Sequence, residues 1–202
     1  AELAQTWITE IEKSVEQAPW RYTDAESLVA IGRTALMTGL DARAVLEQLY
    51  DRAQKQKPTL RDAVLATGQL ALDKQDFELA ADIFKKGTET HPNDPDLLWG
   101  ASRALEQRDR PRSLGLLAQA LQANPRHLPS LLSRTEQAIH AEDLKNATEF
   151  LDTAEKVNPH DPDVWSYRAV LATLANDYSA AKAARAKALA GWAKNPRVDC
   201  LI

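Results

Sequence analysis

Apolar and polar positions follow a helical period along most of the chain. Within residues 76–95, Phe77, Ala80, Phe84 and Gly87 recur at the spacing of one helix face, and Pro92 closes the loop that follows. Similar stretches separated by short loops predict a chain made of helices. The expected helices span 3–18, 24–38, 41–56, 59–74, 77–90, 94–108, 111–123, 127–141, 144–157, 161–175 and 178–194.

The helical stretches form a repeating unit. Prolines stand at 58, 92, 125, 159 and 196, so the spacings are 34, 33, 34 and 37 residues. Five positions before the first four prolines stands a small residue, and eight positions before each stands a larger one. The small residues are Ala53, Gly87, Ala120 and Ala154, and the larger ones are Tyr50, Phe84, Leu117 and Leu151. The last unit is expected to carry extra residues before Pro196.

This pattern resembles the tetratricopeptide repeat, a helix–turn–helix unit of about 34 residues that a proline closes. In that family the first helix carries a bulky residue and a small one four positions later. Leu28 with Gly32, Val64 with Gly68 and Trp165 with Ala169 match, whereas Leu98 with Ser102 and Leu131 with Thr135 depart. The resemblance covers residues 25–196. It implies an all-α fold, a right-handed α-solenoid of antiparallel helix pairs in a TPR-like superhelix.

The repeats predict the division of the chain. Residues 1–24 are expected to form an N-terminal capping helix or the second helix of an incomplete repeat, with Leu3, Trp7, Ile11 and Val15 on one stripe. Five repeats follow, and residues 197–202 begin a further helix. The repeats are expected at 25–58, 59–92, 93–125, 126–159 and 160–196. A solenoid normally ends in a polar cap, whereas this sequence ends at the start of a further helix. The sequence is therefore expected to be part of a longer protein.

Residue types that carry chemistry do not gather in this sequence. Three of the four histidines, His91, His127 and His160, fall at matching positions in inter-repeat loops, which places them far apart along the solenoid. The acidic pairs Asp94/Asp96 and Asp161/Asp163 could bind a metal, but each surrounds a proline at a helix start, where capping explains them. Cys200, the only cysteine, is expected to be a buried structural thiol. No catalytic residue, cofactor or metal site is predicted.

The resemblance implies a concave groove lined by the first helix of each repeat. Position by position, it places ten residues in this groove as a peptide-binding surface. They are Arg33, Met37, Leu65, Gln69, Trp99, Arg103, Glu106, Leu132, Glu136 and His140. One subtype of the family grips a C-terminal carboxylate with Lys and Asn, and neither stands at the corresponding positions here. The mixed apolar and charged lining favours an extended or helical peptide with apolar anchors.

Trp99 and Arg103, one helical turn apart, are the expected centre of this surface, because Trp and Arg dominate interface energetics. The alternative is that Trp99 packs between neighbouring repeats as part of the core. The two interpretations predict different exposure of its side chain.

Composition and charge limit the classes of molecule that the protein is expected to bind. The formal net charge is −4, which argues against nucleic acid as a partner, and no apolar run is long enough to span a bilayer. The basic residues Lys182, Arg185, Lys187 and Lys194 are expected to form a solvated helix face. A soluble protein of the cytoplasm or the periplasm fits these features. Self-association through the solenoid ends is a further expectation.

The sequence therefore predicts a non-catalytic scaffold that binds a protein or peptide in its groove. The alternative is the helical docking arm of a larger enzyme whose catalytic domain lies outside these residues. A third hypothesis is RNA binding by a different helical repeat of similar length. That repeat needs a basic groove and lacks the proline joint.

Overall fold

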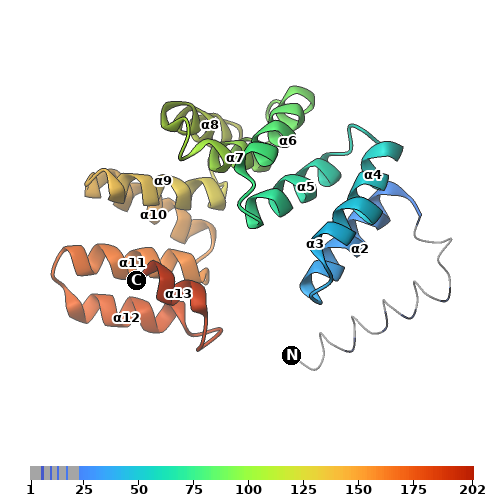
Figure 1. Ribbon diagram of the computed structural model, residues 1–202. Helices are drawn as coiled ribbons and strands as arrows, with labels where there is room; N and C mark the ends of the chain where they lie inside the picture. Colours follow the sequence, from blue (N-terminus) through green and yellow to red (C-terminus); the bar gives the residue numbers. More distant parts are fainter. Residues whose placement is uncertain (1–5, 7–9, 11–12, 14–16, 18–22) are drawn as a thin grey trace. The chain divides into compact units, whose positions relative to one another are not determined.

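The computed structural model describes Thr6, Glu10, Lys13, Gln17 and residues 23–202. The expected N-terminal helix, with Trp7 and its apolar stripe, lies outside the described residues. Residues 23–202 form helices joined by short turns, with no strand among them (Figure 1). The chain divides into two compact units, Ala1–Ser113 and Leu114–Ile202, called here the N-terminal and C-terminal units.

The N-terminal unit consists of helix pairs. Helix α2 pairs with a continuous helical segment, α5 pairs with α6, and α7 follows; α8 begins at the end of this unit and runs into the next. The continuous segment consists of α3, a π-helical turn η2, and α4. The bounds are α2 Ala25–Met37, α3 Ala42–Val45, η2 Leu46–Tyr50, α4 Asp51–Gln56, α5 Arg61–Asp73, α6 Phe77–Thr90, α7 Pro95–Leu105 and α8 Arg110–Ala123.

The C-terminal unit repeats the arrangement. Helix α9 packs against α10, α11 packs against α12, and the short α13 packs on α11. The bounds are α9 Leu128–His140, α10 Leu144–Val157, α11 Pro162–Leu174, α12 Tyr178–Ala188 and α13 Pro196–Leu201. The expectation of antiparallel helix pairs in an all-α fold is confirmed.

Aspartates fix most of the helix starts. The carboxylate at each such N-cap accepts a hydrogen bond from a backbone N–H inside the first turn, which has no partner within the helix. The N-caps with this bond are Asp24, Asp41, Asp76, Asp94, Asp109, Asp143, Asp161 and Asp177. The predicted capping by Asp94 and Asp161, each followed by proline, is confirmed.

The last helix pair differs from its prediction. Helix α12 ends at Ala188 instead of 194, and a loop containing Gly191 leads to α13. Asn195 is the N-cap of α13 and Pro196 stands in its first turn, as Asp161 and Pro162 do in α11. Pro196 therefore corresponds to Pro162, 34 residues earlier, and not to the loop proline Pro159. The spacing of 37 residues came from comparing prolines at different repeat positions.

Short turns between paired helices share one strained residue. Gln75, Glu142 and Asn176 have φ values of 60°, 58° and 61°, in the left-handed region, and Gly39 takes this place in the first turn with φ 88°. Each stands seven residues after the position of its first helix where the family carries a small residue, namely Gly32, Gly68, Thr135 or Ala169. The turn between α7 and α8 lacks this residue, since Asp109 comes seven residues after Ser102 and caps α8 through the N–H of Arg112.

The core between helices depends on close approach. A Cβ built on Gly68 would lie 2.5 Å from Cζ of Phe84, and one built on Gly100 would lie 2.3 Å from the same ring. Gly32 leaves the same room for Tyr50, at 2.3 Å. Glycine at these three positions is therefore required by aromatic rings of the facing helices. At the next junction, the buried hydroxyls of Ser102 and Ser113 share a hydrogen bond of 2.8 Å.

Candidate binding surface

The first helices of the N-terminal unit lie in sequence, with α2 against α5 and α5 against α7. On each helix one residue anchors the core, and the residue five positions later lies about 140° round the helix. The anchors are Leu28, Val64 and Leu98, all buried. The corresponding later residues are Arg33, Gln69 and Arg103, which reach solvent fully or in part. We call these three residues the polar row.

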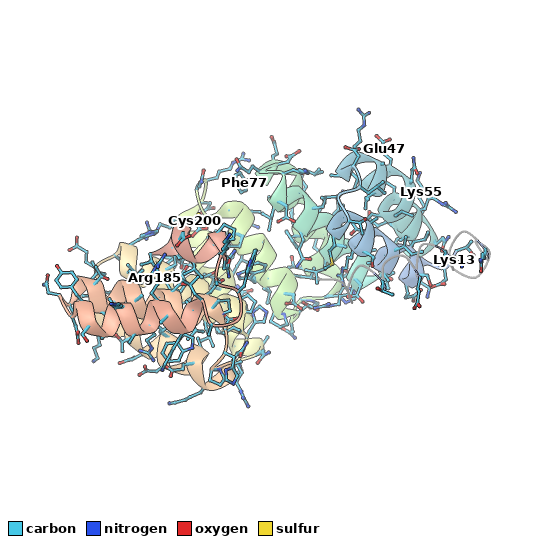
Figure 2. All side chains as sticks on the ribbon, turned by 90° about the horizontal axis from the view of Figure 1, so that it is seen from below. Lys13, Glu47, Lys55, Phe77, Arg185 and Cys200 are labelled. Carbon is cyan, nitrogen blue, oxygen red and sulfur yellow. The ribbon has the colours of Figure 1, made fainter. Side chains whose placement is uncertain are left out.

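Trp99 and Arg103 stand on α7, and both are partly exposed. Trp99 is therefore neither fully buried between repeats nor fully open on the binding surface. Arg103 Nη1 donates to Glu106 Oε2 at 2.7 Å, which joins two residues that the resemblance placed in the groove. Arg103 also lines a shallow hollow of about 290 Å³ together with Phe77 of α6. Phe77 is exposed (Figure 2) and was not among the predicted groove residues.

Two other predicted groove residues of this unit have opposite surroundings. Met37, the last residue of α2, is 83% exposed. Leu65 is only 6% exposed, because α5 is contacted by α2, α6, α7 and η2 at once. The expectation that Leu65 lines a binding surface is therefore corrected, since its side chain belongs to the core.

Three predicted residues stand on α9 in the C-terminal unit. Leu132 packs against the apolar cluster that contains Leu131 and Tyr167, Glu136 is partly exposed, and His140 is exposed at the last position of the helix. Each unit thus presents a set of these residues on its own first helices. A single groove across both units stays a prediction.

The acidic pair at the start of α7 is held by an arginine. Arg61 Nε donates to Asp94 Oδ2 at 2.6 Å, and its Nη2 donates to both Asp94 and Asp96. Burial pushes the pKa of Asp94 upward, but hydrogen bonds from Arg61 and the N–H of Leu97 outweigh it and leave the pKa below its ordinary value. The hydrogen bond with Asp94 raises the pKa of Arg61 in turn. A guanidinium occupies the place that the alternative hypothesis gave to a metal ion.

A similar pair joins α11 and α13. Arg197 Nε donates to both carboxylate oxygens of Asp163, at 2.9 and 2.7 Å. Burial raises the pKa of Asp163 above its ordinary value, and the charge of Arg197 opposes this only in part. Both pairs connect residues 33 to 35 positions apart. An opposite charge one repeat length away was the available sequence signal, and it was missed.

The remaining candidates have structural roles or lie apart. His91 Nε2 donates to the carbonyl of Thr59 at 2.9 Å, and the buried His127 shares a hydrogen bond of 2.8 Å with Ser130. Within the described residues, no group of three His, Cys, Asp or Glu side chains is placed to hold a metal ion. The expectation for Cys200 is wrong: its thiol is exposed (Figure 2). The helix α13 buries Val198, two positions earlier and on another side.

None of the helices in the described part of the chain combines the length and the apolar character needed to cross a bilayer.

Comparison with known proteins gives the fold. No family model matches the sequence, and no curated protein shows significant sequence similarity to it. A thermophilic TPR protein of Thermus thermophilus, TTC0263, matches with a TM-score of 0.73 and 22% identity over 87% of this chain and 95% of that one.

Two further structures agree. PilW, a type IV pilus biogenesis factor, matches with a TM-score of 0.70 and 12% identity over 98% of this chain and 90% of that one. YrrB, described as a TPR protein with an unusual peptide-binding site, has a TM-score of 0.53 and 16% identity over 94% and 95%. With the helix pairs, the cap positions and the small residues at the helix contacts, these matches show that the chain has the fold of the tetratricopeptide-repeat proteins.

Proposed function

We propose that this chain is a non-catalytic scaffold for protein–protein interaction that binds an extended peptide segment across the first helices of its N-terminal unit. The observation that carries the proposal is the polar row beside Trp99, with a hollow next to Arg103 that Phe77 lines. An accessible arginine beside partly exposed aromatic rings is the composition that dominates binding energy in protein interfaces. The peptide-binding site of YrrB supports the choice of ligand class.

The chemistry of the surface suggests the ligand. Arg33 and Arg103 of the polar row carry positive charge, Gln69 between them can donate and accept hydrogen bonds, and Met37 exposes a flexible apolar side chain. A peptide with a carboxylate and an apolar anchor one or two residues apart meets these groups. Leu132, Glu136 and His140 of the C-terminal unit are proposed to offer further contacts.

The test begins with a peptide library displayed on phage and panned against the whole chain, followed by titration of the selected peptides by calorimetry. The double variant Trp99→Ala/Arg103→Ala is expected to weaken binding at least tenfold, which corresponds to about 1.4 kcal/mol. Lys85→Ala, an exposed change on α6, is the matched control and is expected to bind like the wild type.

Because Trp99 is partly buried, Arg103→Glu serves as a second variant that leaves Trp99 in place, reverses the charge of the surface and removes the hydrogen bond to Glu106. Circular dichroism checks that both variants keep their helices. Wild-type affinity in both variants, with the helices intact, would overturn the assignment of this surface.

A further inference from the structure

A separate hollow in the C-terminal unit has the makings of a second binding site. It encloses about 730 Å³ between the loop before α11 and the loop that joins α12 to α13. Trp165, Trp192, Pro159, Pro162, His160 and Lys187 are among its lining residues, and we call it the tryptophan hollow. Both tryptophans of this unit line it. Its volume lies in the range of ligand sites, and it lies where the inter-repeat loops meet the start of α11 and the end of α12.

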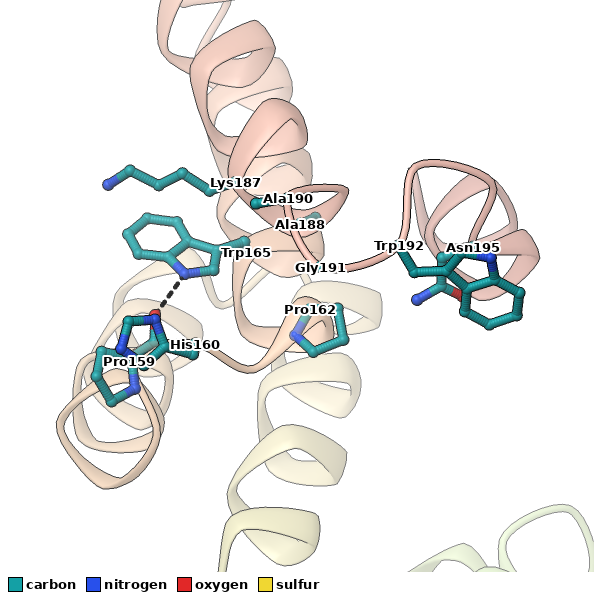
Figure 3. A pocket seen from close by; sticks show the side chains of 10 residues that line it. All are labelled: Pro159, His160, Pro162, Trp165, Lys187, Ala188, Ala190, Gly191, Trp192 and Asn195. Carbon is teal, nitrogen blue, oxygen red and sulfur yellow. Dashed lines mark hydrogen bonds between the residues drawn. The ribbon is translucent and has the colours of Figure 1, made fainter. Parts of the chain in front are cut away.

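Trp165 forms one fixed wall. Its indole Nε1 donates to the carbonyl of Pro159 at 2.8 Å, so the ring cannot turn without losing a hydrogen bond (Figure 3). The ammonium of Lys187 lies 3.8 Å from the ring centroid, on one face of the indole. The hollow therefore contains a rigid aromatic plane with a positive charge beside it.

Trp192 lies on the other side of the hollow, with Pro162 between the two indoles in the view of Figure 3. It stands in the loop after α12 and is 59% exposed, although it is the largest kind of apolar side chain. The loop is tied at its end, because Asn195 N–H donates to the carbonyl of Trp192 at 3.1 Å and the Asn195 side chain caps α13. An exposed indole on a fixed backbone offers both a ring face and an N–H donor.

The two walls of the hollow differ in charge, since the loop before α11 and the first turn of that helix contain Asp161 and Asp163, whereas α12 and the loop after it are basic. Residues 178–198 contain five of the chain's 25 Lys and Arg residues and none of its 29 Asp and Glu residues. Arg185 and Arg197 pair with Asp199 and Asp163, and Lys187 lies against Trp165. Lys182 and Lys194 are exposed, and Lys194 adjoins the hollow through Asn195. In a protein of net charge −4, this local positive surface favours a negatively charged partner.

We infer that the tryptophan hollow binds an extended, proline-containing segment of another protein whose prolines are flanked by Asp or Glu. Proline rings pack flat on indole rings, and a polyproline II segment is already extended, so it loses little conformational freedom on binding. The prolines pack on the exposed ring of Trp192 beside Pro162, Trp192 Nε1–H donates to a peptide carbonyl, and the flanking carboxylates meet Lys187 and Lys194. The positive charge beside Trp165 disfavours a cationic ligand.

The probe is a synthetic peptide, Asp-Glu-Pro-Pro-Leu-Pro-Pro-Glu-Asp, titrated into the whole chain by calorimetry at low and at physiological salt. Wild type is expected to bind it, and binding is expected to weaken several-fold as salt screens the lysines. Trp192→Ala is expected to weaken binding at least tenfold and Lys194→Glu about threefold. A peptide with Lys in place of its acids, and one with Ala in place of its prolines, are both expected to bind at least tenfold more weakly.

Tyr178→Ala is the matched control, since Tyr178 is an exposed aromatic residue at the other end of α12. It is expected to leave the affinity unchanged. The Trp99→Ala/Arg103→Ala variant is also expected to bind the probe like wild type, so failure of the first proposal would not disturb this one.

Three results would overturn the inference. One is equal affinity of the wild type and Trp192→Ala for the probe. Another is equal binding of the proline-free peptide, which would reduce the site to a charged surface. The last is a concentration-dependent dimer in sedimentation that Trp192→Ala abolishes, because the hollow would then be covered by a second copy of the chain.

Discussion

The two units solve the same packing problem with different residues. In the N-terminal unit, Phe84 of α6 fits against Gly68 of α5 and Gly100 of α7, which have no side chains to obstruct the ring. The corresponding residues in the C-terminal unit, 67 positions later, are Leu151, Thr135 and Tyr167. Leu151 and Tyr167 belong to one apolar cluster. The aromatic ring has moved from the second helix of a pair to the first helix of the next pair.

This comparison shows what the repeat preserves. The contact between the helices is kept while the residues that fill it vary, because Leu151 is smaller than Phe84 and the residues facing it, Thr135 and Tyr167, are larger than the glycines. A small–large–small pattern in one helix therefore describes only part of the packing. Where the large residue of that helix is smaller, the residues that face it from the neighbouring helices are larger. Thr135 departs from the family's small residue, and its hydroxyl is satisfied by the carbonyl of Leu131 at 3.0 Å.

Removal of the two large residues is expected to have the largest effect. Phe84→Ala should lower the free energy of unfolding by about 3–5 kcal/mol, because the glycines on both sides cannot fill the cavity. Leu151→Ala should cost about 2–4 kcal/mol, since Tyr167 can partly occupy the space. Urea unfolding gives the totals, and hydrogen exchange of α5–α7 against α9–α11 locates the loss. A larger loss for Leu151→Ala would contradict the comparison.

The opposite change adds a side chain where the structure has none. It should destabilise the fold most where a glycine contacts the Phe84 ring. Gly100→Ala is expected to cost about 1–3 kcal/mol, because its Cβ would lie 2.3 Å from the Phe84 ring. In a Phe84→Leu background the same substitution should cost less, and the double-mutant cycle measures the coupling between the two positions.

Gly115→Ala is the matched control for that cycle. Gly115 lies in α8 with no atom within 4 Å of an added Cβ, so alanine should stabilise the helix by about 0.5–1 kcal/mol. Equal effects of Gly100→Ala in both backgrounds would show that the ring and the glycine are not coupled.

The ion pairs Arg61–Asp94 in the N-terminal unit and Arg197–Asp163 in the C-terminal unit also differ, and removing either arginine should lower the free energy of unfolding by less than the core substitutions do. Arg61 is 34% exposed at its side chain and Asp94 15%, whereas Arg197 is 68% exposed beside an Asp163 that is 14% exposed. Arg61→Met should cost about 1–3 kcal/mol, since it leaves the carboxylate of Asp94 without its main partner. Arg197→Met should cost less, under about 1 kcal/mol, because most of the Arg197 side chain is in solvent, which screens its charge. Thermal unfolding of both variants checks the order, and a larger loss for Arg197→Met would refute it.

The smallest expected effect is on the pH dependence of stability, to which Asp94 and Asp163 should contribute with opposite signs. The pKa of Asp94 is lowered from 3.8, so the unfolded chain binds its proton first, and this contribution to stability disappears as pH falls below about 4. The pKa of Asp163 is raised from 3.8, so the folded chain binds its proton first, and stability declines as pH rises above about 4 through that pKa.

Stability measured against pH in the Asn variants tests these signs. Asp94→Asn should flatten the profile on the acid side, and Asp163→Asn should flatten it on the other side. Both asparagines can still cap or accept hydrogen bonds, which limits other changes. Identical profiles for the two variants would show that the two pairs do not differ in this way.

The sequence predicted the features that depend on neighbours in the chain. Within residues 23–202, the helix ranges apart from the end of α12, and the caps at Asp94 and Asp161, follow from local spacing and agree with the structure. The burial of Leu65 and the pairing of Arg61 with Asp94 depend on which helices lie beside α5, and one helix alone carries no such information. The tryptophan hollow joins two loops about 30 residues apart, so Trp165 and Trp192 gave no sign of sharing one site.

The π-helical turn Leu46–Tyr50 accommodates a difference in length between the repeats of this protein. From the capping aspartate to the large residue of the second helix there are eight residues in the pairs that begin at Asp76, Asp109 and Asp143, but nine from Asp41 to Tyr50. A π turn accommodates one more residue than an α turn, so the ring of Tyr50 still meets Gly32. Relative to the other repeats, the first repeat therefore contains one inserted residue and keeps its core contact. Deleting Gln48 should return the segment to an ordinary α-helix, which makes this insertion reversible.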